Sequence, residues 1–507
     1  MDDNGKGIMS HSHCFGFKLS NCDKKFIITL ALLLLVYILP IILADRLYID
    51  DILRSQQGYK NWGINGRPLA DILMAHFNFT EGVIADSSPL TLLFSSVIFL
   101  LCSLVYYRKN LGSYGFLFGA LAMFMVFANP FMLENLSYKF DVLPMVTSLS
   151  VLLIPYSVDR SKVYGLLVGV LCIVSSLSLY QASIGFFCTL ALVEMITTYR
   201  DKNYSAISYI ISIIIRATQL IIGYAIYSKI SSYFISGEYN IEHSQIVSLD
   251  RSGISLIYSN ASTYFDKIHQ AINETTSVAY LIVAISMMCC IFISLSRRDK
   301  VPGNIFSRIS LALCLILSPV LVLAFSFIHL SILKYPVFAD RVLISFGGAL
   351  LFYSTSMATL VKWKSFASML IIPVVFFSMY YSYVYGNAMK YQRQYDDRLS
   401  HEIATVISNA DTTGSLPVYT YGSQPSSIQR SNAVNRFPSL DTLVPLYYVD
   451  GWWGTLLINM YGIRNKVSGL YDVTQVCSMR VISENQSYSI YKDSSKIIID
   501  FSKYKCK

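Results

Sequence analysis

Apolar residues gather along this chain in runs of about 18 to 25, the length that an α-helix needs to cross the hydrocarbon core of a bilayer. We interpret eleven such runs as membrane spans. They cover residues 26–44, 89–107, 111–128, 142–157, 163–180, 182–199, 205–235, 277–295, 305–328, 340–361 and 366–386. Because this count is odd, the two ends of the chain are predicted to lie on opposite sides of the membrane.

Basic residues predict the orientation of these spans, because cytoplasmic loops are enriched in lysine and arginine. Every second loop carries a tight basic group. The groups are Lys24/Lys25, Arg108/Lys109, Arg160/Lys162, Arg200/Lys202, Arg297/Arg298/Lys300 and Lys362/Lys364. The N-terminal tail, residues 1–25, is therefore predicted to be cytoplasmic. The loops at 45–88 and 129–141 are predicted to face outward, as is the chain after the last span.

Composition agrees with a polytopic membrane protein. Of the 507 residues, 54% are hydrophobic and only 14% are charged, whereas soluble domains have about 25% charged residues. The formal net charge of +9 does not indicate nucleic-acid binding, because the basic residues lie mostly in short loops between spans. The first apolar run has no small-residue cleavage site after it, so a removable signal peptide is not expected.

The chain after the last predicted span changes character. Residues 396–408 fit a helix, whereas 415–421 and 487–491 alternate as strands do. Tyrosines and tryptophans are too frequent here for a disordered tail. Residues 387–507 are therefore predicted to form a small α+β domain outside the membrane, next to a transmembrane domain over residues 26–386.

The ten cysteines divide by location. Six lie in apolar runs and are expected to be small core residues. Cys477 and Cys506 lie in the polar C-terminal part, where a disulfide between them is expected if that part faces an oxidising compartment. None of the cysteine spacings resembles a zinc or iron–sulfur site.

The first outward loop, residues 45–88, concentrates the candidate chemistry. Its candidate residues are Asp50, Asp51, Arg54, Trp62 and Arg67. A carboxylate can take a proton from a sugar hydroxyl, an arginine can bind phosphate through two parallel hydrogen bonds, and an aromatic ring can cover a sugar. The alternative is a solvated loop in which the two carboxylates pair locally with Arg46 and Arg54.

The second outward loop, residues 129–141, adds Glu134, Lys139 and Asp141. A lysine beside an aspartate at the mouth of a span suits an anionic lipid head group. Interfacial anchoring is an equal alternative, with Lys139 reaching toward water and Tyr138 in an aromatic belt.

Two further outward segments carry polar candidates. Tyr180 and Gln181 lie at a tight turn, where Gln181 is expected to cap the turn, with hydrogen bonds to sugar hydroxyls as the alternative. Arg341 enters an apolar run and needs a partner, either Asp340 or a bound phosphate. His329 is expected to be structural.

The absent motifs narrow the function. The sequence has no Walker A motif, no dinucleotide glycine fingerprint and no zinc-protease helix. The inward loops are too short to hold a nucleotide-binding domain. A sugar donor is therefore expected to arrive within the lipid, at an active site that faces outward.

Four stretches, taken together, resemble a known family. They are YIDDILRSQQGYKNWGINGRPLADIL, LENLSYKFDVLPM, SLSLYQASIG and YPVFADRVL, in this order. With them, residues 26–386 resemble the serotype-converting O-antigen glucosyltransferases carried by bacterial phages, and the length and span count suit the type I subgroup. The resemblance implies a GT-C-type fold in the bacterial inner membrane.

The same resemblance implies the reactants. The donor would be undecaprenyl-phosphate glucose, supplied by a partner synthase and a small flippase. The acceptor would be a sugar of the lipid-linked O-antigen in the periplasm. No cofactor, no obligatory metal and no nucleic acid are implied.

The resemblance also implies roles for the candidates. Either Asp50 or Asp51 would be the general base, in a reaction that inverts the anomeric carbon. The leaving phosphate would be stabilised by Arg54, Arg67, Lys139 or Arg341. The full substrate-binding set is Arg54, Trp62, Arg67, Glu134, Lys139, Asp141, Tyr180, Gln181 and Arg341.

Two rival functions remain open from the sequence. A transporter or flippase for a polysaccharide intermediate would place polar residues near the middle of the membrane and show repeated halves, whereas the charges here gather at the outer interface. A non-catalytic assembly partner would not need Asp50, Asp51 or Arg67.

Overall fold

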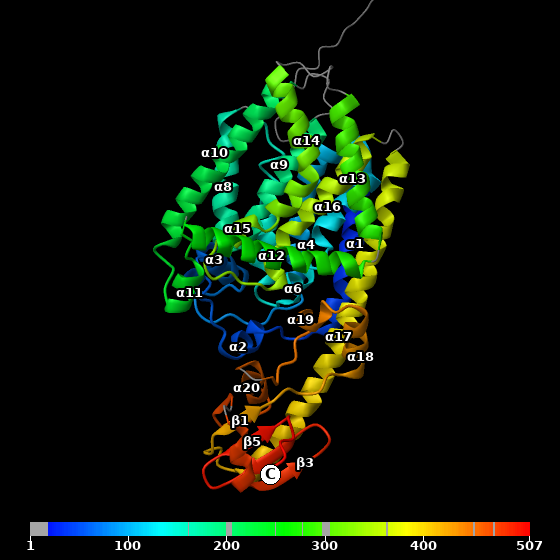
Figure 1. Cartoon of the computed structure of the whole chain (residues 1–507). Helices are drawn as coiled ribbons and strands as arrows, with labels where there is room; N and C mark the ends of the chain where they lie inside the picture. The colour runs from blue at the N-terminus through cyan, green and yellow to red at the C-terminus, as the bar shows by residue number, and fades with distance from the viewer. Residues whose placement is uncertain are drawn as a thin grey trace, which may run out of the picture.

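The computed structural model describes residues 19–160, 162–198, 205–248, 250–275, 277–296, 305–360, 364–449, 452–469 and 472–506. It is mostly helical. Long helices run side by side in a bundle, and a small sheet domain lies beyond one end of that bundle (Figure 1).

Each predicted span contains one apolar helix, and these helices differ in length. These helices are α1 (Asn21–Ala44), α4 (Leu90–Tyr106), α5 (Phe116–Phe127), α7 (Val142–Val151), α8 (Val163–Leu179), α9 (Ile184–Thr198), α10 (Ala206–Ser231), α13 (Ser277–Ser296), α14 (Ile305–Phe325), α16 (Phe346–Leu360) and α17 (Lys364–Ala410). Their existence follows from the apolar runs, because a backbone in lipid must satisfy its own hydrogen bonds.

In the described part of the chain, fewer helices are long enough to span a membrane than the eleven predicted spans require. Within the described residues, six helical stretches are long and apolar enough to cross a membrane. Helices α5 and α7 have only 12 and 10 residues, against the roughly 20 that a spanning helix needs. The structure therefore shows a membrane protein with about six candidate spans, and the count of eleven remains a prediction.

Burial separates central from peripheral helices. The most apolar part of the stretch Asp340–Thr359, which covers nearly all of α16, is 89% buried, whereas the corresponding parts of the stretches Ile207–Ser231 and Arg308–Phe325 are 28% buried. Gly347 permits the close packing of α16, since a Cβ there would lie 2.3 Å from the carbonyl oxygen of Val126. The central position of α16 fixes the loop that precedes it.

Short elements cap one end of the bundle. The loop between α1 and α4 holds α2 (Asp50–Gln57), η1 (Gly63–Asn65) and α3 (Pro68–Phe77). The other short elements are α6 (Met132–Ser137), η4 (Gln181–Ser183), α11 (Glu238–His243), α15 (Ile328–Ser331) and η5 (Asp340–Ser345). Helix α12 (Arg251–Glu274) lies across the axis of the long helices at the same end (Figure 1).

Helix α17 continues through the predicted domain boundary at residue 386. Its 47 residues form one unbroken helix, and the separately predicted helix at 396–408 is its last part. The composition changes at the boundary because the helix leaves its apolar surroundings, but the backbone does not change. The helix therefore connects the bundle to the C-terminal domain directly.

The C-terminal domain is the small α+β unit that the sequence predicts. Its strands are β1 (Val418–Tyr421), β2 (Val467–Gly469), β3 (Arg480–Glu484), β4 (Ser489–Lys492) and β5 (Ile497–Asp500), in the order β2-β1-β5-β4-β3. Strand β1 is parallel to β2 and β5, and β4 is antiparallel to β3 and β5. The remaining elements are α18 (Ile428–Arg436), α19 (Leu440–Leu443), α20 (Trp452–Asn459) and η6 (Val473–Ser478). Ile490, Ile497 and Ile499 pack against Ile403 and Ile407 of α17.

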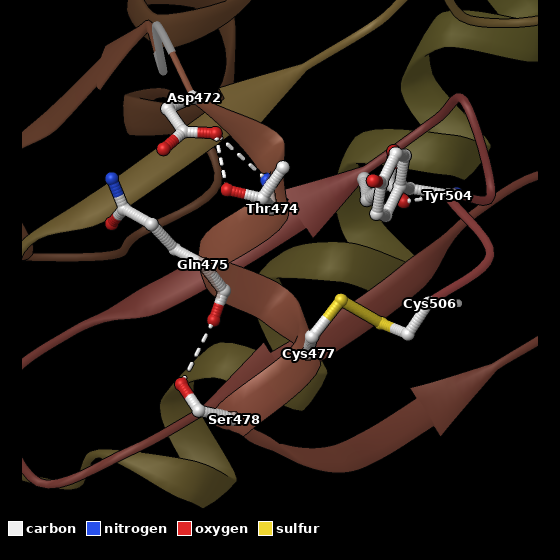
Figure 2. Close-up of a disulfide and its surroundings, with 8 residues drawn as sticks. Asp472, Thr474, Gln475, Cys477, Ser478, Tyr504 and Cys506 are labelled. Carbon is white, nitrogen blue, oxygen red and sulfur yellow. Dashed lines mark hydrogen bonds between the residues drawn. A yellow bond between two sulfur atoms is a disulfide. The ribbon is translucent and has the colours of Figure 1, made fainter.

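Cys477 and Cys506 form a disulfide between η6 and the C-terminal segment, with their Cα atoms 5.5 Å apart (Figure 2). Closing a loop with a sequence separation of 29 residues restricts the unfolded chain and stabilises the domain by about 3 to 4 kcal/mol. We expect thiol reagents to label these two cysteines only after reduction, measured by mass spectrometry of the intact protein. Labelling without a reductant would contradict the pairing.

Candidate functional site

The two adjacent aspartates at the start of α2 have different surroundings. Asp51 is fully buried, and its carboxylate accepts backbone N–H groups from Tyr48 (3.1 Å), Lys139 (2.8 Å) and Phe140 (3.4 Å). These bonds join the loop at 45–88 to the loop at 129–141. Burial raises the pKa of Asp51 to about 8, although the Lys139 amide lowers it. With its oxygens enclosed, this carboxylate connects the two loops and is not open to a substrate.

Asp50 is half-buried, and different charged groups act on it. Within the described part of the chain, its carboxylate has no hydrogen bond and no ion pair. Burial raises its pKa, and the charge of Asp141 raises it further. Arg341, Arg54 and Arg67 act in the opposite direction. Asp50 is therefore an unpaired, accessible carboxylate beside three arginines, the environment expected of a general base.

Asp141 joins the loop's tryptophan and arginines. It accepts a hydrogen bond from Trp62 Nε1 at 2.6 Å and forms a close ion pair with Arg54, while Arg67 lies 4.0 Å away. The Arg54 guanidinium also lies over the Trp62 ring, 4.2 Å from its centroid. Trp62 is 1% exposed, which argues against the predicted contact of its ring with a sugar. These contacts hold Arg54 and Trp62 of the loop against Asp141 in the interior of the protein.

Arg67 contacts Gln181 and Tyr180 in addition to Asp141. Its Nε donates to Gln181 Oε1 at 3.0 Å, and its guanidinium lies 4.6 Å from the centroid of the Tyr180 ring. The Gln181 amide donates to Asn65 O and Tyr227 Oη, so it connects the loops and does not cap its own turn as predicted. The Arg67 side chain remains 23% exposed, which leaves N–H groups free for an anion.

Arg341 is paired, but not with the predicted residue. Its Nη1 lies 2.6 Å from Glu134 Oε1, and its backbone N–H donates to Glu134 Oε2 at 2.7 Å. Asp340 pairs instead with Lys267, at 2.9 Å. The expectation of an Asp340–Arg341 pair is therefore wrong, because η5 directs the two neighbouring side chains to different helices. The Arg341 side chain is 24% exposed.

Lys139 binds both ends of the loop at 45–88. Its Nζ lies 2.6 Å from Asp45 and 3.3 Å from Asp86, and its side chain is 12% exposed. It is thus neither a free interfacial anchor nor an open site for a lipid head group. The alternative of a solvated loop paired the aspartates of α2 with Arg46. This pairing is wrong, because Arg46 pairs with Asp396.

Sequence reasoning missed Tyr138, which it placed in an aromatic belt. The residue is 1% exposed, and its hydroxyl has no hydrogen-bond partner among the described residues. Burial raises its pKa well above the usual range, with Arg341 opposing and Asp50 adding to the shift. A buried hydroxyl without a partner is rare unless a ligand or water completes it. No sequence pattern distinguishes this tyrosine from the other 36.

The structure thus brings together residues from four segments far apart in the sequence. These residues are Asp50, Arg54, Arg67, Tyr138, Asp141, Tyr180 and Arg341. The site is polar and positively charged around one free carboxylate. In the parts of the chain that the structure covers, no three His, Cys, Asp or Glu side chains group closely enough to hold a metal ion.

Comparisons with known proteins identify the family of this chain. No solved structure matches the chain. A Salmonella phage P22 protein, described as an "Uncharacterized 55.3 kDa protein in gtrB 5'region", is 27% identical over 475 residues, covering 90% of this chain and 93% of that protein. The family described as "Glucosyl transferase GtrII" matches residues 39–352, which include every arginine and aspartate of the site. The chain therefore belongs to the GtrII glucosyltransferase family.

Proposed function

We propose that this protein transfers glucose from undecaprenyl-phosphate glucose to a sugar of the lipid-linked O-antigen, on the periplasmic side of the inner membrane, and so changes the serotype. Membership of a glucosyltransferase family supports the sugar transfer. The observation that carries the mechanism is the unpaired Asp50 carboxylate beside Arg67 and Arg341. We infer a GT-C-type fold from the resemblance to the serotype-converting O-antigen glucosyltransferases.

Asp50 is the general base in this mechanism. Its carboxylate takes the proton of an acceptor hydroxyl, and that oxygen forms a bond to the anomeric carbon of glucose. The bond from this carbon to the phosphate oxygen breaks, and undecaprenyl phosphate leaves with the electron pair. Attack from the side opposite the phosphate inverts the anomeric carbon. We prefer Asp50 to Asp51 as the base because backbone amides enclose the oxygens of Asp51.

Arg67 and Arg341 bind the phosphate of the donor. The Arg67 and Arg341 side chains are partly exposed, whereas the Arg54 side chain is buried against Asp141. Fixed cations in a site that excludes water stabilise the charge on a leaving phosphate more strongly than cations in bulk water do. Lys139 pairs with Asp45 and Asp86 and does not contact the donor phosphate in this mechanism.

The proposed orientation places this site outward. The N-terminus is then cytoplasmic and the C-terminal domain periplasmic, with a donor synthase and a small flippase as functional partners. The site lies at the bundle end that leads into the disulfide-bonded domain (Figure 1). Disulfides persist in oxidising compartments such as the periplasm, which supports this orientation.

Transfer by the purified protein tests the proposal. Full-length protein in lipid nanodiscs receives undecaprenyl-phosphate glucose with radiolabelled glucose, together with lipid-linked O-antigen. We expect label in the O-antigen and release of undecaprenyl phosphate. Absence of both with folded protein would refute the function. Transport of an unmodified intermediate across a vesicle membrane would favour the flippase alternative instead.

A further inference from the structure

The turn before Asp50 has an unusual backbone. Ile49 adopts φ 47° and ψ −101°, a region that β-branched residues rarely occupy. Such a conformation persists only where the surroundings hold it. This turn lies between the end of α1 and the start of α2. It therefore sets the direction of α2, and with it the position of Asp50.

Residues of the C-terminal domain hold this turn. The Tyr447 hydroxyl donates to Leu47 O at 2.6 Å and accepts the Ile49 N–H at 3.5 Å. The Tyr48 hydroxyl donates in the opposite direction, to Leu443 O at 3.1 Å. The segment 443–447 therefore binds the backbone at Leu47 and at the strained Ile49 itself, although about 400 residues of chain separate the two segments.

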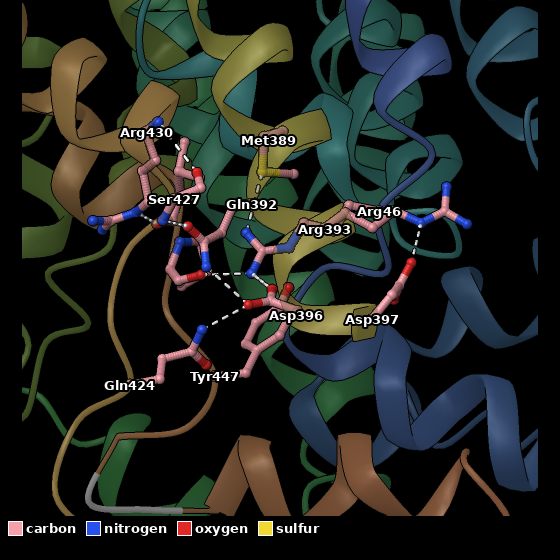
Figure 3. A network of polar contacts seen from close by, with 12 residues as sticks. Arg46, Met389, Gln392, Arg393, Asp396, Asp397, Gln424, Ser427, Arg430 and Tyr447 are labelled. Atoms are coloured by element: carbon pink, nitrogen blue, oxygen red, sulfur yellow. Dashed lines mark hydrogen bonds and ion pairs between the residues drawn. The ribbon is translucent and has the colours of Figure 1, made fainter. Parts of the chain in front are cut away.

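A buried ion pair fixes this segment in turn (Figure 3). Arg46 Nη2 lies 2.7 Å from Asp396 Oδ2 and donates to Pro445 O at 2.7 Å. The Arg46 guanidinium lies 4.1 Å from the centroid of the Tyr447 ring. The Arg46 and Asp396 side chains are 2% and 3% exposed. The ion pair thus anchors the Tyr447 ring, whose hydroxyl reaches the turn.

Two glutamines complete the pair on the side of α17. The second Asp396 oxygen accepts hydrogen bonds from Gln392 Nε2 at 2.8 Å and Gln424 Nε2 at 2.7 Å. A buried carboxylate with this many donors is stable in one orientation. The position of Tyr447 is therefore set by α17 and not only by its own loop.

We propose that Arg46, Asp396 and Tyr447 form a clamp by which the C-terminal domain positions Asp50 for proton transfer. Tyr447 is then a positioning residue for the reaction, and the C-terminal domain contributes to turnover as well as to any binding of the acceptor. This inference rests on the proposed function. The alternative is a clamp that only docks the domain on the bundle.

Two neighbouring tyrosines give a matched test. Tyr447→Phe removes the hydroxyl at the turn and keeps the ring under Arg46. Tyr448→Phe removes a similarly buried hydroxyl that binds Ser400 Oγ at 2.7 Å, inside the domain and away from the turn. We expect Tyr447→Phe to lower kcat by about 10- to 100-fold, since small displacements of a reacting group have effects of this size. KM for the donor should change by less than about twofold, and Tyr448→Phe should keep the wild-type kcat.

The pH profile separates positioning from docking. In Tyr447→Phe the acid limb of kcat/KM should shift, because Asp50 moves relative to its arginines, whereas in Tyr448→Phe it should not. Equal kcat in the two variants, with equal melting temperatures, would overturn the clamp and leave the proposed function intact. If the wild type transfers no glucose, the proposed function itself fails. If Tyr447→Phe does not fold, Tyr48→Phe, which loses only the bond to Leu443, carries the same expectation.

Discussion

Asp50→Asn is expected to lower the rate of glucosyl transfer by about 100- to 10,000-fold, the range that a general base contributes. Asparagine has nearly the same shape but cannot take the proton of the acceptor hydroxyl. The Asp50 carboxylate has no partner in the described structure, so its loss leaves no other group unpaired, and the protein should remain folded. Turnover is measured with the purified variant in nanodiscs, and in cells by sugar analysis of lipopolysaccharide.

Asp51→Asn is the matched control. An amide oxygen can accept from fewer of the Tyr48, Lys139 and Phe140 N–H groups than a carboxylate does, so the loops should separate more easily. We expect a lower melting temperature, and a smaller loss of activity per folded molecule than Asp50→Asn causes. If Asp51→Asn is the inactive variant and Asp50→Asn is not, the assignment of the base is reversed.

The pH dependence follows from the surroundings of Asp50. Burial and Asp141 raise its pKa above that of an ordinary aspartate. A general base works only when it is ionised, so kcat/KM should fall as the pH drops through this raised pKa, and should be constant above it. The acid limb is therefore expected at higher pH than an unperturbed aspartate would give, and it should be absent from the residual activity of Asp50→Asn.

The sequence predicted the site's location better than its pairing. Apolar runs and basic loops placed Asp50, Arg67, Asp141, Tyr180 and Arg341 on outward loops, and the structure brings these loops together. This works because the bilayer forces each run into a helix, and loops that face the same side can meet only at that side. The apolar runs and the basic loops therefore predict which segments come together at the site.

The partners within that neighbourhood depend on distant contacts. Arg341 pairs with Glu134, 207 residues earlier, and not with its neighbour Asp340. The difference between Asp50 and Asp51 comes from the second outward loop, which covers only one of the two. The strained Ile49 depends on a loop of the C-terminal domain. The spacing of residues in the sequence does not predict these contacts, because they depend on how the assembled helices and loops pack.

Arg341→Ala is expected to lower kcat by about 100- to 1,000-fold, the loss seen when one group that stabilises developing anionic charge is removed. The change has a second effect. Glu134 is 4% exposed and both of its oxygens bind Arg341, and a buried charge whose partner is removed costs about 3 to 5 kcal/mol of stability. The single variant should therefore be both slower and less stable, as measured by turnover and thermal unfolding.

The double variant Arg341→Ala, Glu134→Gln separates the two effects. Glutamine removes the buried negative charge, so the melting temperature should recover most of its loss. Turnover should not recover, because the cation that faces the phosphate is still absent. Glu134→Gln alone should keep Arg341 near its place, through the remaining amide oxygen, and lose little activity. If the double variant regained wild-type turnover along with its stability, Arg341 would have only a structural role, and phosphate stabilisation would have to come from Arg67 alone.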